Sequence, residues 1–157
     1  MASKLLEHLS WLGHDSFLLE TDSAVIYFDP WRLPEGLPQA DLVLVSHEHG
    51  DHSSPEDVAR ISGPETIIVA SEKAAAELEG DVRVMHPGER LAVAGVEVEA
   101  VPAYNVDKFR SPGVPFHPHS SRHNGYVVAV AGECVYFAGD TDHIPEMANI
   151  ECDVALL

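Results

Sequence analysis

The chain is short of basic residues. Nine lysines and arginines stand against 26 aspartates and glutamates among 157 residues, which gives a formal net charge of −17. Contacts to nucleic-acid phosphates need clustered lysine and arginine, so this composition argues against nucleic-acid binding, and the acidity also repels anionic membranes. The excess of negative charge suits high salt or simple solubility, and we favour solubility.

Cysteines and long apolar runs are also scarce. Only Cys134 and Cys152 occur, each in an apolar stretch, so we predict buried free thiols and a reducing compartment. No apolar run approaches the roughly 20 residues of a membrane-spanning helix, and the first eight residues carry no signal-peptide pattern. We therefore expect one cytoplasmic domain over 1–157, without a membrane partner.

One stretch concentrates metal-ligand side chains. The apolar Leu42–Val45 segment predicts a buried strand, and four potential ligands follow it within six positions: His47, His49, Asp51 and His52. Imidazole and carboxylate are the usual ligands of zinc, iron and manganese. Residues two apart in an extended turn project to the same side. This predicts that His47 and His49 share one ion while Asp51 and His52 face a second.

Periodicity and turn residues predict an alternation of strands and short helices. Strands are expected at 5–12, 17–20, 24–28, 42–45, 66–70, 82–85, 91–93, 96–101, 125–130, 134–137 and 153–157. Helices are expected from a serine cap at 53 to 61, from 71 to 79 before a glycine, and at 145–148. Residues 31–40 are predicted to be a loop that either borders a cleft or only connects two strands. Residues 102–119 are predicted to be a longer, irregular loop.

The segment His47-Glu-His-Gly-Asp-His52, at the end of a strand, resembles the signature of the metallo-β-lactamase superfamily. Trp11–His14, Phe28–Pro30 and Tyr136–Asp142 occur in the matching order. In detail the chain is similar to a branch of metal-dependent hydrolases related to the ascorbate-6-phosphate lactonases. The resemblance implies an α/β fold, a four-layer αββα sandwich of two mixed β-sheets with helices outside, lacking its C-terminal portion.

The resemblance also implies roles for residues that the sequence alone leaves open. It makes Asp140 a bridge between two ions, makes Asp29 a support for the metal-binding histidines, and places His14 near the active site. Without the resemblance, ordinary turns are the favoured interpretation of all three residues.

Two departures from the family pattern stand out. The position of a third histidine for the first metal is taken by Asn105, a poor zinc ligand. Three later histidines could replace it, and we favour His117, with His123 second and His119 last. The alternative is that all three lie on the loop surface. The family's final histidine lies beyond the strand at 153–157, so we expect either a fragment or a homo-oligomer in which a second copy covers the exposed sheet.

The implied activity is metal-assisted hydrolysis. One or two divalent ions, zinc first and manganese or iron as alternatives, would lower the pKa of a bound water and polarise a scissile carbonyl or phosphoryl group, while Asp51 orients or deprotonates the water. The expected substrate is a small anionic ester, lactone or phosphoester. The alternative is a truncated, weakly metal-binding domain that assembles with another chain. Redox chemistry at a di-iron site is disfavoured, because relatives of that kind carry an acid where His49 stands.

Overall fold

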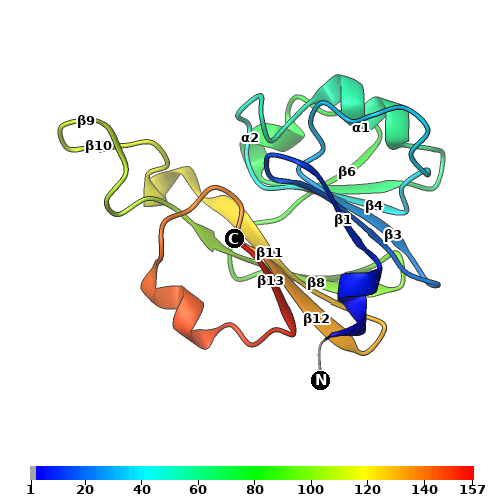
Figure 1. The fold of residues 1–157 in the computed structure, drawn as a ribbon. Helices are drawn as coiled ribbons and strands as arrows, with labels where there is room; N and C mark the ends of the chain where they lie inside the picture. Colours follow the sequence, from blue (N-terminus) through cyan, green and yellow to red (C-terminus); the bar gives the residue numbers. More distant parts are fainter. Residues whose placement is uncertain (1–2) are drawn as a thin grey trace.

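Two β-sheets packed face to face form the body of the protein in a computed structural model, which describes residues 3–157 (Figure 1). The first sheet has the strand order β1-β2-β3-β4-β5-β6 and the second has the order β13-β12-β11-β8-β7. The first sheet contains β1 (Leu9–Gly13), β2 (Ser16–Glu20), β3 (Val25–Phe28), β4 (Leu42–Val45), β5 (Ile67–Ala70) and β6 (Asp81–Val84). The second contains β7 (Arg90–Val93), β8 (Val96–Ala103), β11 (His123–Val130), β12 (Glu133–Phe137) and β13 (Val154–Leu156).

The first sheet changes from antiparallel to parallel pairing at β3. Strands β1, β2 and β3 form an antiparallel meander, and β3 to β6 run parallel to one another. Parallel neighbours need a crossover connection. Here α1 (Pro55–Ile61) connects β4 to β5, and α2 (Glu72–Ala75) connects β5 to β6. Both helices lie on the same outer face of the sheet (Figure 1).

Side chains that alternate along β4 show how the layers are held together. Leu42 and Leu44 face the second sheet, where they join a core with Phe28, Tyr126 and Phe137. The intervening valines, Val43 and Val45, face the helices. All four residues of β4 are fully buried. A central strand that is covered on both faces reads as a continuous apolar run, which explains the pattern seen in the sequence.

The expected sandwich of two mixed sheets with outer helices is confirmed. The helical layer outside the second sheet is small. On the outside of the second sheet, the described chain supplies the 3₁₀ helix η3 (Pro145–Asn149), whose Met147 packs against Val101 and Tyr136. The pairing of an exposed sheet edge with a second copy stays a prediction. Among residues 3–157, no helix is long and apolar enough to cross a membrane.

Three predicted elements differ from those observed. The segment expected to begin a strand at Leu5 starts with the 3₁₀ helix η1 (Lys4–Glu7), because the Ser3 side chain caps it by accepting a hydrogen bond from the Leu5 N–H. Helix α2 ends at Ala75 rather than at residue 79, and the chain continues with tighter i−3 bonds until Gly80.

The irregular loop contains a small hairpin of β9 (Phe109–Ser111) and β10 (Val114–Pro115). It projects from the body of the protein (Figure 1). A 3₁₀ helix, η2 (His119–Ser121), follows it.

The prediction of two buried thiols is wrong. Cys134 is only partly buried and Cys152 is exposed, and both are free. Cys152 lies in the turn before β13 rather than inside the strand, so its side chain is not covered by a neighbouring layer.

Candidate metal centre

The predicted ligands gather where strands of both sheets end. The first sheet contributes the turn after β1, the residue after β3 and the motif after β4, and the second contributes the loop before β11 and the residues after β12. The two sheets are joined at this point because the Asn124 N–H donates to the Ser46 carbonyl over 3.1 Å. The carboxyl ends of parallel strands commonly carry ligand sites in open α/β sheets.

A buried carboxylate organises the motif from behind. Asp29, which is fully buried, accepts a hydrogen bond from the Ser46 N–H over 2.7 Å, one from the Ser46 hydroxyl, and one from His52 Nδ1 over 2.8 Å. The Ser46 hydroxyl, having donated to Asp29, can accept from His47 Nδ1 at 2.9 Å. Both histidines therefore have Nδ1 occupied by a hydrogen bond, which leaves Nε2 as the ring nitrogen that could bind a metal.

His117 is fixed in the same way by a residue of its own loop. Asn105 Oδ1 accepts from His117 Nδ1 over 2.7 Å and from the His117 backbone N–H over 3.0 Å, and both residues are buried. The Nε2 atom of His117 lies 3.1 Å from Nδ1 of His49 and 3.4 Å from Oδ2 of Asp140. The structure thus brings His117 to the motif, and Asn105 orients it.

Asp140 lies between the two groups of histidines. Its Oδ2 atom is 3.4 Å from His117 Nε2 and 3.6 Å from His52 Nε2, which is the position that a bridging carboxylate would take. Gly139 before it has a φ of +68°, and a Cβ there would lie 3.0 Å from the Asn124 carbonyl oxygen. Only glycine allows the chain to pass this closely and turn Asp140 towards the site.

The charge state of the site fits a cation. Burial lowers the pKa of His47, and it lowers the pKa of His123 to about 4, so both rings are neutral. Burial also acts to lower the pKa of His52, but the carboxylates of Asp140 and Asp29 outweigh it and raise that pKa to about 10. A metal ion needs neutral imidazoles as ligands, and the carboxylates around His52 favour positive charge at the same place.

Two orphaned atoms support the same conclusion. Within residues 3–157, the buried Nε2 atoms of His47 and His52 have no hydrogen-bond partner, although buried polar atoms normally have one. Three sets of potential ligand atoms lie within 4.8 Å of one another: His47, His117 and His123; His14, Asp51 and His52; and Asp29, His47 and His52. The residues present therefore fit one or two divalent ions.

Asp51 and His14 stand on the solvent side of the cluster. Oδ2 of Asp51 lies 3.1 Å from Nε2 of His14 and 4.0 Å from Nε2 of His52, and the Asp51 side chain is 49% exposed. The His14 ring packs edge-on against the His52 ring, with 4.9 Å between centroids. Both residues are accessible to a water molecule or a substrate that enters the site.

The other two candidate histidines have different surroundings. His123 is buried and stacks on His47 with 4.8 Å between ring centroids, and its Nε2 lies 3.1 Å from Oε2 of Glu48. His119 is exposed and packs edge-on against Tyr104. The loop-surface alternative therefore holds for His119 but not for His117 or His123.

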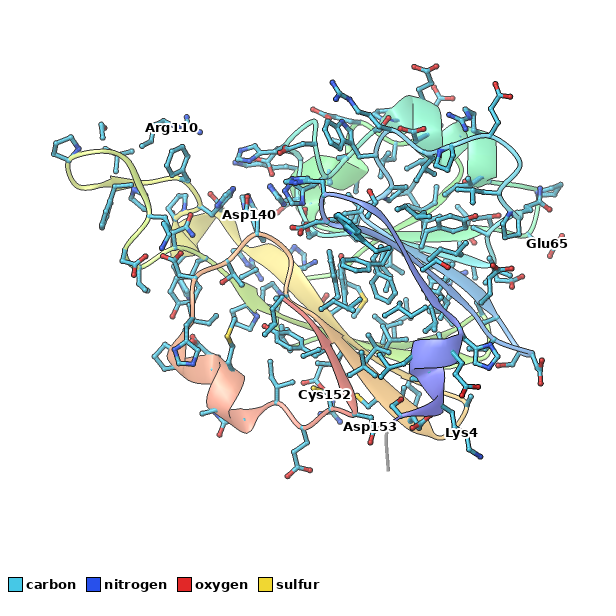
Figure 2. All side chains as sticks on the ribbon, viewed as in Figure 1. Lys4, Glu65, Arg110, Asp140, Cys152 and Asp153 are labelled. Carbon is cyan, nitrogen blue, oxygen red and sulfur yellow. The ribbon has the colours of Figure 1, made fainter. Side chains whose placement is uncertain are left out.

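A cleft of about 660 Å³ opens beside these side chains. Its lining includes His49, Asp51 and Asp140, together with residues of the 105–117 loop and its hairpin. Asp142 anchors that loop by accepting backbone N–H bonds from Val106 and Asp107, each over 2.8 Å, and from residue 108 over 3.1 Å. Figure 2 shows Asp140 next to the base of the loop that carries Arg110.

Sequence reasoning missed three residues that shape the site, Ser46, Asp142 and Asp15, and it named Asn105 without predicting its role. Ser46, Asn105 and Asp142 act through hydrogen bonds, and Oδ2 of Asp15 lies 3.6 Å from His52 Nδ1. Desolvation by burial raises the pKa of Asp15. Asp15 and Ser46 could have been suspected, since each adjoins a candidate ligand in sequence. Nothing local links Asn105 to His117, twelve residues away.

Comparisons with known proteins agree with this geometry. A family model described as a β-lactamase superfamily domain matches residues 8–157. A metal-dependent hydrolase of the UPF0173 family from Methanopyrus kandleri is 32% identical over 165 residues, covering 95% of this chain and 70% of the relative. Another from Cereibacter sphaeroides is 26% identical, covering 88% of this chain and 65% of the relative.

A solved structure extends the comparison to three dimensions. A Parabacteroides distasonis protein assigned as a metal-dependent hydrolase superimposes with a TM-score of 0.81 and 35% identity, covering 94% of this chain and 67% of that one. The chain therefore belongs to the β-lactamase superfamily. It spans about 65% to 70% of the length of these curated relatives.

Proposed function

We propose that this member of the β-lactamase superfamily is a metal-dependent hydrolase acting on a small ester, lactone or phosphoester. The first ion would be held by His47, His49 and His117, the second by Asp51 and His52, and Asp140 would lie between them. Imidazole and carboxylate donors suit zinc, with manganese and iron as alternatives. His123, buried against His47, is the competing candidate for the first ion.

One observation carries the proposal: hydrogen bonds on the far side of three histidine rings leave their Nε2 atoms as ligand atoms. His47 is held by Ser46, His52 by Asp29 and His117 by Asn105. A hydrogen-bonded Nδ1–H selects the tautomer and raises the basicity of the ligand atom, which is how proteins prepare histidine for a metal. A structural cluster of histidines would not need three rings oriented in this way.

The bound ions would supply Lewis acidity, which lowers the pKa of water and polarises a carbonyl or phosphoryl group. The chain's own residues would then position the reactants. Asp51, which is half exposed and is assigned to the second ion with His52, orients the attacking water and accepts its proton. His14, 3.1 Å from Asp51 and itself 41% exposed, transfers that proton to solvent. The cleft is large enough for a small molecule.

Metal content tests the proposal first. The parent, His47→Ala and His119→Ala are dialysed against metal-free buffer after loading with zinc, and ions per chain are measured by elemental mass spectrometry. The parent and His119→Ala should keep one or two ions, and His47→Ala should lose at least one. His119 is the matched control, because it is a histidine of the adjacent loop that lies outside the cluster.

Hydrolysis then separates the proposal from its alternative. The zinc-loaded parent is assayed against a lactone, a p-nitrophenyl ester and a bis-p-nitrophenyl phosphate, with and without chelator. Chelator-sensitive turnover that His47→Ala lacks would support a hydrolase. A parent that keeps its ions, sediments as an oligomer and hydrolyses none of these substrates would favour the assembly role.

A further inference from the structure

Two of the nine basic residues of this acidic chain line the cleft beside the candidate metal centre. Lys108 and Arg110 lie on or next to the β9–β10 hairpin, and both contribute to the cleft wall together with His117 and Asp140. Figure 2 shows Arg110 on the projecting hairpin, on the same side of the molecule as Asp140. Because positive charge is scarce in this chain, its presence at the cleft favours an anionic ligand there.

The two cations are not equivalent. Nζ of Lys108 lies 2.7 Å from Oδ1 of Asp107 and 3.7 Å from Oδ1 of Asp142, so its charge is used within the loop. Arg110 forms no ion pair with any carboxylate of residues 3–157. Its guanidinium carbon instead lies 5.6 Å from the centre of the Phe116 ring, within cation–π range. The five donors of Arg110 remain available to an incoming oxyanion.

The hairpin holds Arg110 in a defined relation to the metal-binding side chains. The Phe116 N–H donates to the Lys108 carbonyl over 3.2 Å, and the next residue, His117, accepts from the Asn105 N–H over 2.8 Å. The base of the loop is fixed by the three N–H bonds that Asp142 accepts. A group bound by Arg110 would therefore lie in the same cleft as His117, on a loop whose base is held to the site.

The same loop exposes apolar side chains. Four of the eight large hydrophobic residues exposed on the described chain lie on it: Val106, Phe109, Val114 and Phe116. Phe116 lines the cleft beside Arg110. Phe116 is the one large apolar side chain among the described residues that line the cleft, so Arg110 and Phe116 together suit a ligand with an anionic group next to a short apolar segment.

We propose that Arg110 forms a subsite for a carboxylate or phosphate group of the substrate, remote from the bond that is broken. The proposal rests on the proposed function, because the other end of the substrate is taken to bind at the metal ions. It narrows the substrate class to small molecules with two oxygen-rich ends joined by an apolar segment. Arg110 and Phe116 then determine specificity, while His47 to His52 perform the chemistry.

Binding of matched acids tests the subsite without turnover. Isothermal titration of the zinc-loaded chain uses the dicarboxylates from malonate to adipate, a phosphonocarboxylate of each length, and monocarboxylates of equal chain length. One dicarboxylate length should bind about tenfold more tightly than its monocarboxylate at low salt, since a charge-assisted hydrogen bond forms at the second end. The advantage should disappear in Arg110→Gln and persist in part in Arg110→Lys. The phosphonocarboxylates then distinguish phosphate from carboxylate as the preferred group.

Arg83→Gln is the control for net charge, because Arg83 is exposed and paired with Asp81 on β6, away from the cleft. It should keep the parent's preference. A zinc-loaded parent that binds every acid equally well at each length overturns the subsite. An Arg110→Gln variant that still prefers the dicarboxylate also overturns the subsite. If Arg110→Gln changes only the sedimentation of the protein, the subsite is likewise overturned, and the hairpin is assigned to contact with a second copy. If the parent binds no zinc, the proposed function is refuted and not the subsite. Measuring metal content before any acid is added identifies this outcome.

Discussion

Replacing Asn105 with alanine tests how the site is built, because this residue binds no metal in our assignment and yet controls a ligand. Asn105 Oδ1 accepts two hydrogen bonds from His117, one from Nδ1 at 2.7 Å and one from the backbone N–H at 3.0 Å. Alanine removes this one acceptor and leaves two buried donors of His117 unsatisfied. The expected loss in free energy of unfolding is ~2–4 kcal/mol, taking the usual penalty for a buried unsatisfied group twice and allowing for partial relaxation.

The loss of zinc affinity in Asn105→Ala should be larger than the lowered stability of the fold alone would cause. Without Asn105, the His117 ring can rotate and can protonate Nε2 in place of Nδ1, so its ligand atom is no longer fixed towards His49 and Asp140. Removing such a supporting partner typically weakens a metal site by about 10- to 100-fold. Competition against a chromophoric chelator measures this loss directly.

Asn105→Asp is the conservative partner of this experiment. A carboxylate accepts the same two bonds, so zinc affinity should stay within about threefold of the parent, judged against the 10- to 100-fold effect of losing the partner. Nitrogen chemical shifts of the His117 ring report the tautomer in both variants, with Nδ1 protonated in the parent and in Asn105→Asp. If Asn105→Ala binds zinc as tightly as the parent and His117 keeps its tautomer, the orientation argument is wrong.

Three further predictions concern the framework. Phe28→Ala should lower the free energy of unfolding by ~3–5 kcal/mol in a denaturant titration, because the ring is fully buried between the sheets, whereas Phe109→Ala, on the exposed hairpin, should stay within about 0.5 kcal/mol. Asp142→Asn should speed amide exchange at 106–108 about tenfold, since the carboxylate accepts three N–H bonds there; unchanged exchange would mean that other contacts hold the loop. Gly139→Ala should destabilise the fold by ~1–3 kcal/mol, because its Cβ would lie 3.0 Å from a backbone oxygen at a φ of +68°, and a variant with the parent's melting temperature would contradict the close approach.

The proposed subsite would let an acidic protein favour anions at one place. The carboxylates of Asp51 and Asp140 would be compensated by the ions that they bind, and Asp29 is paired with His52. The remaining positive charge at the cleft then comes from the hairpin, at Arg110. In this proposal, the local charge at Arg110, and not the net charge of the whole protein, would determine which substrate the cleft accepts.

Local patterns determined the elements that carry the motif. The strand at Leu42–Val45 and the helix that ends at Ile61 were predicted with their observed limits or nearly so, because a run of branched apolar residues and a serine cap act within a few positions. The ligand cluster at 47–52 was also visible, since four donors follow one strand. Where local signals were weaker, the observed structure differs from the predicted one. The Ser3 hydrogen bond starts a 3₁₀ helix within residues 5–8, and tighter i−3 bonds replace the predicted α-helix within residues 76–79.

The sequence by itself therefore determined the family, the two-sheet sandwich and the first set of candidate ligands. Only the tertiary structure decided which distant residues serve them. His117 reaches the cluster because Asp142 and Asn105 tie down its loop, and Asp140 reaches it because Gly139 lets β12 pass close to Ser46. The exposed position of Cys152 and the approach of the hairpin to the cleft were equally invisible. Periodicity records which face of an element is covered, but contacts between residues far apart in the chain depend on how the two sheets pack.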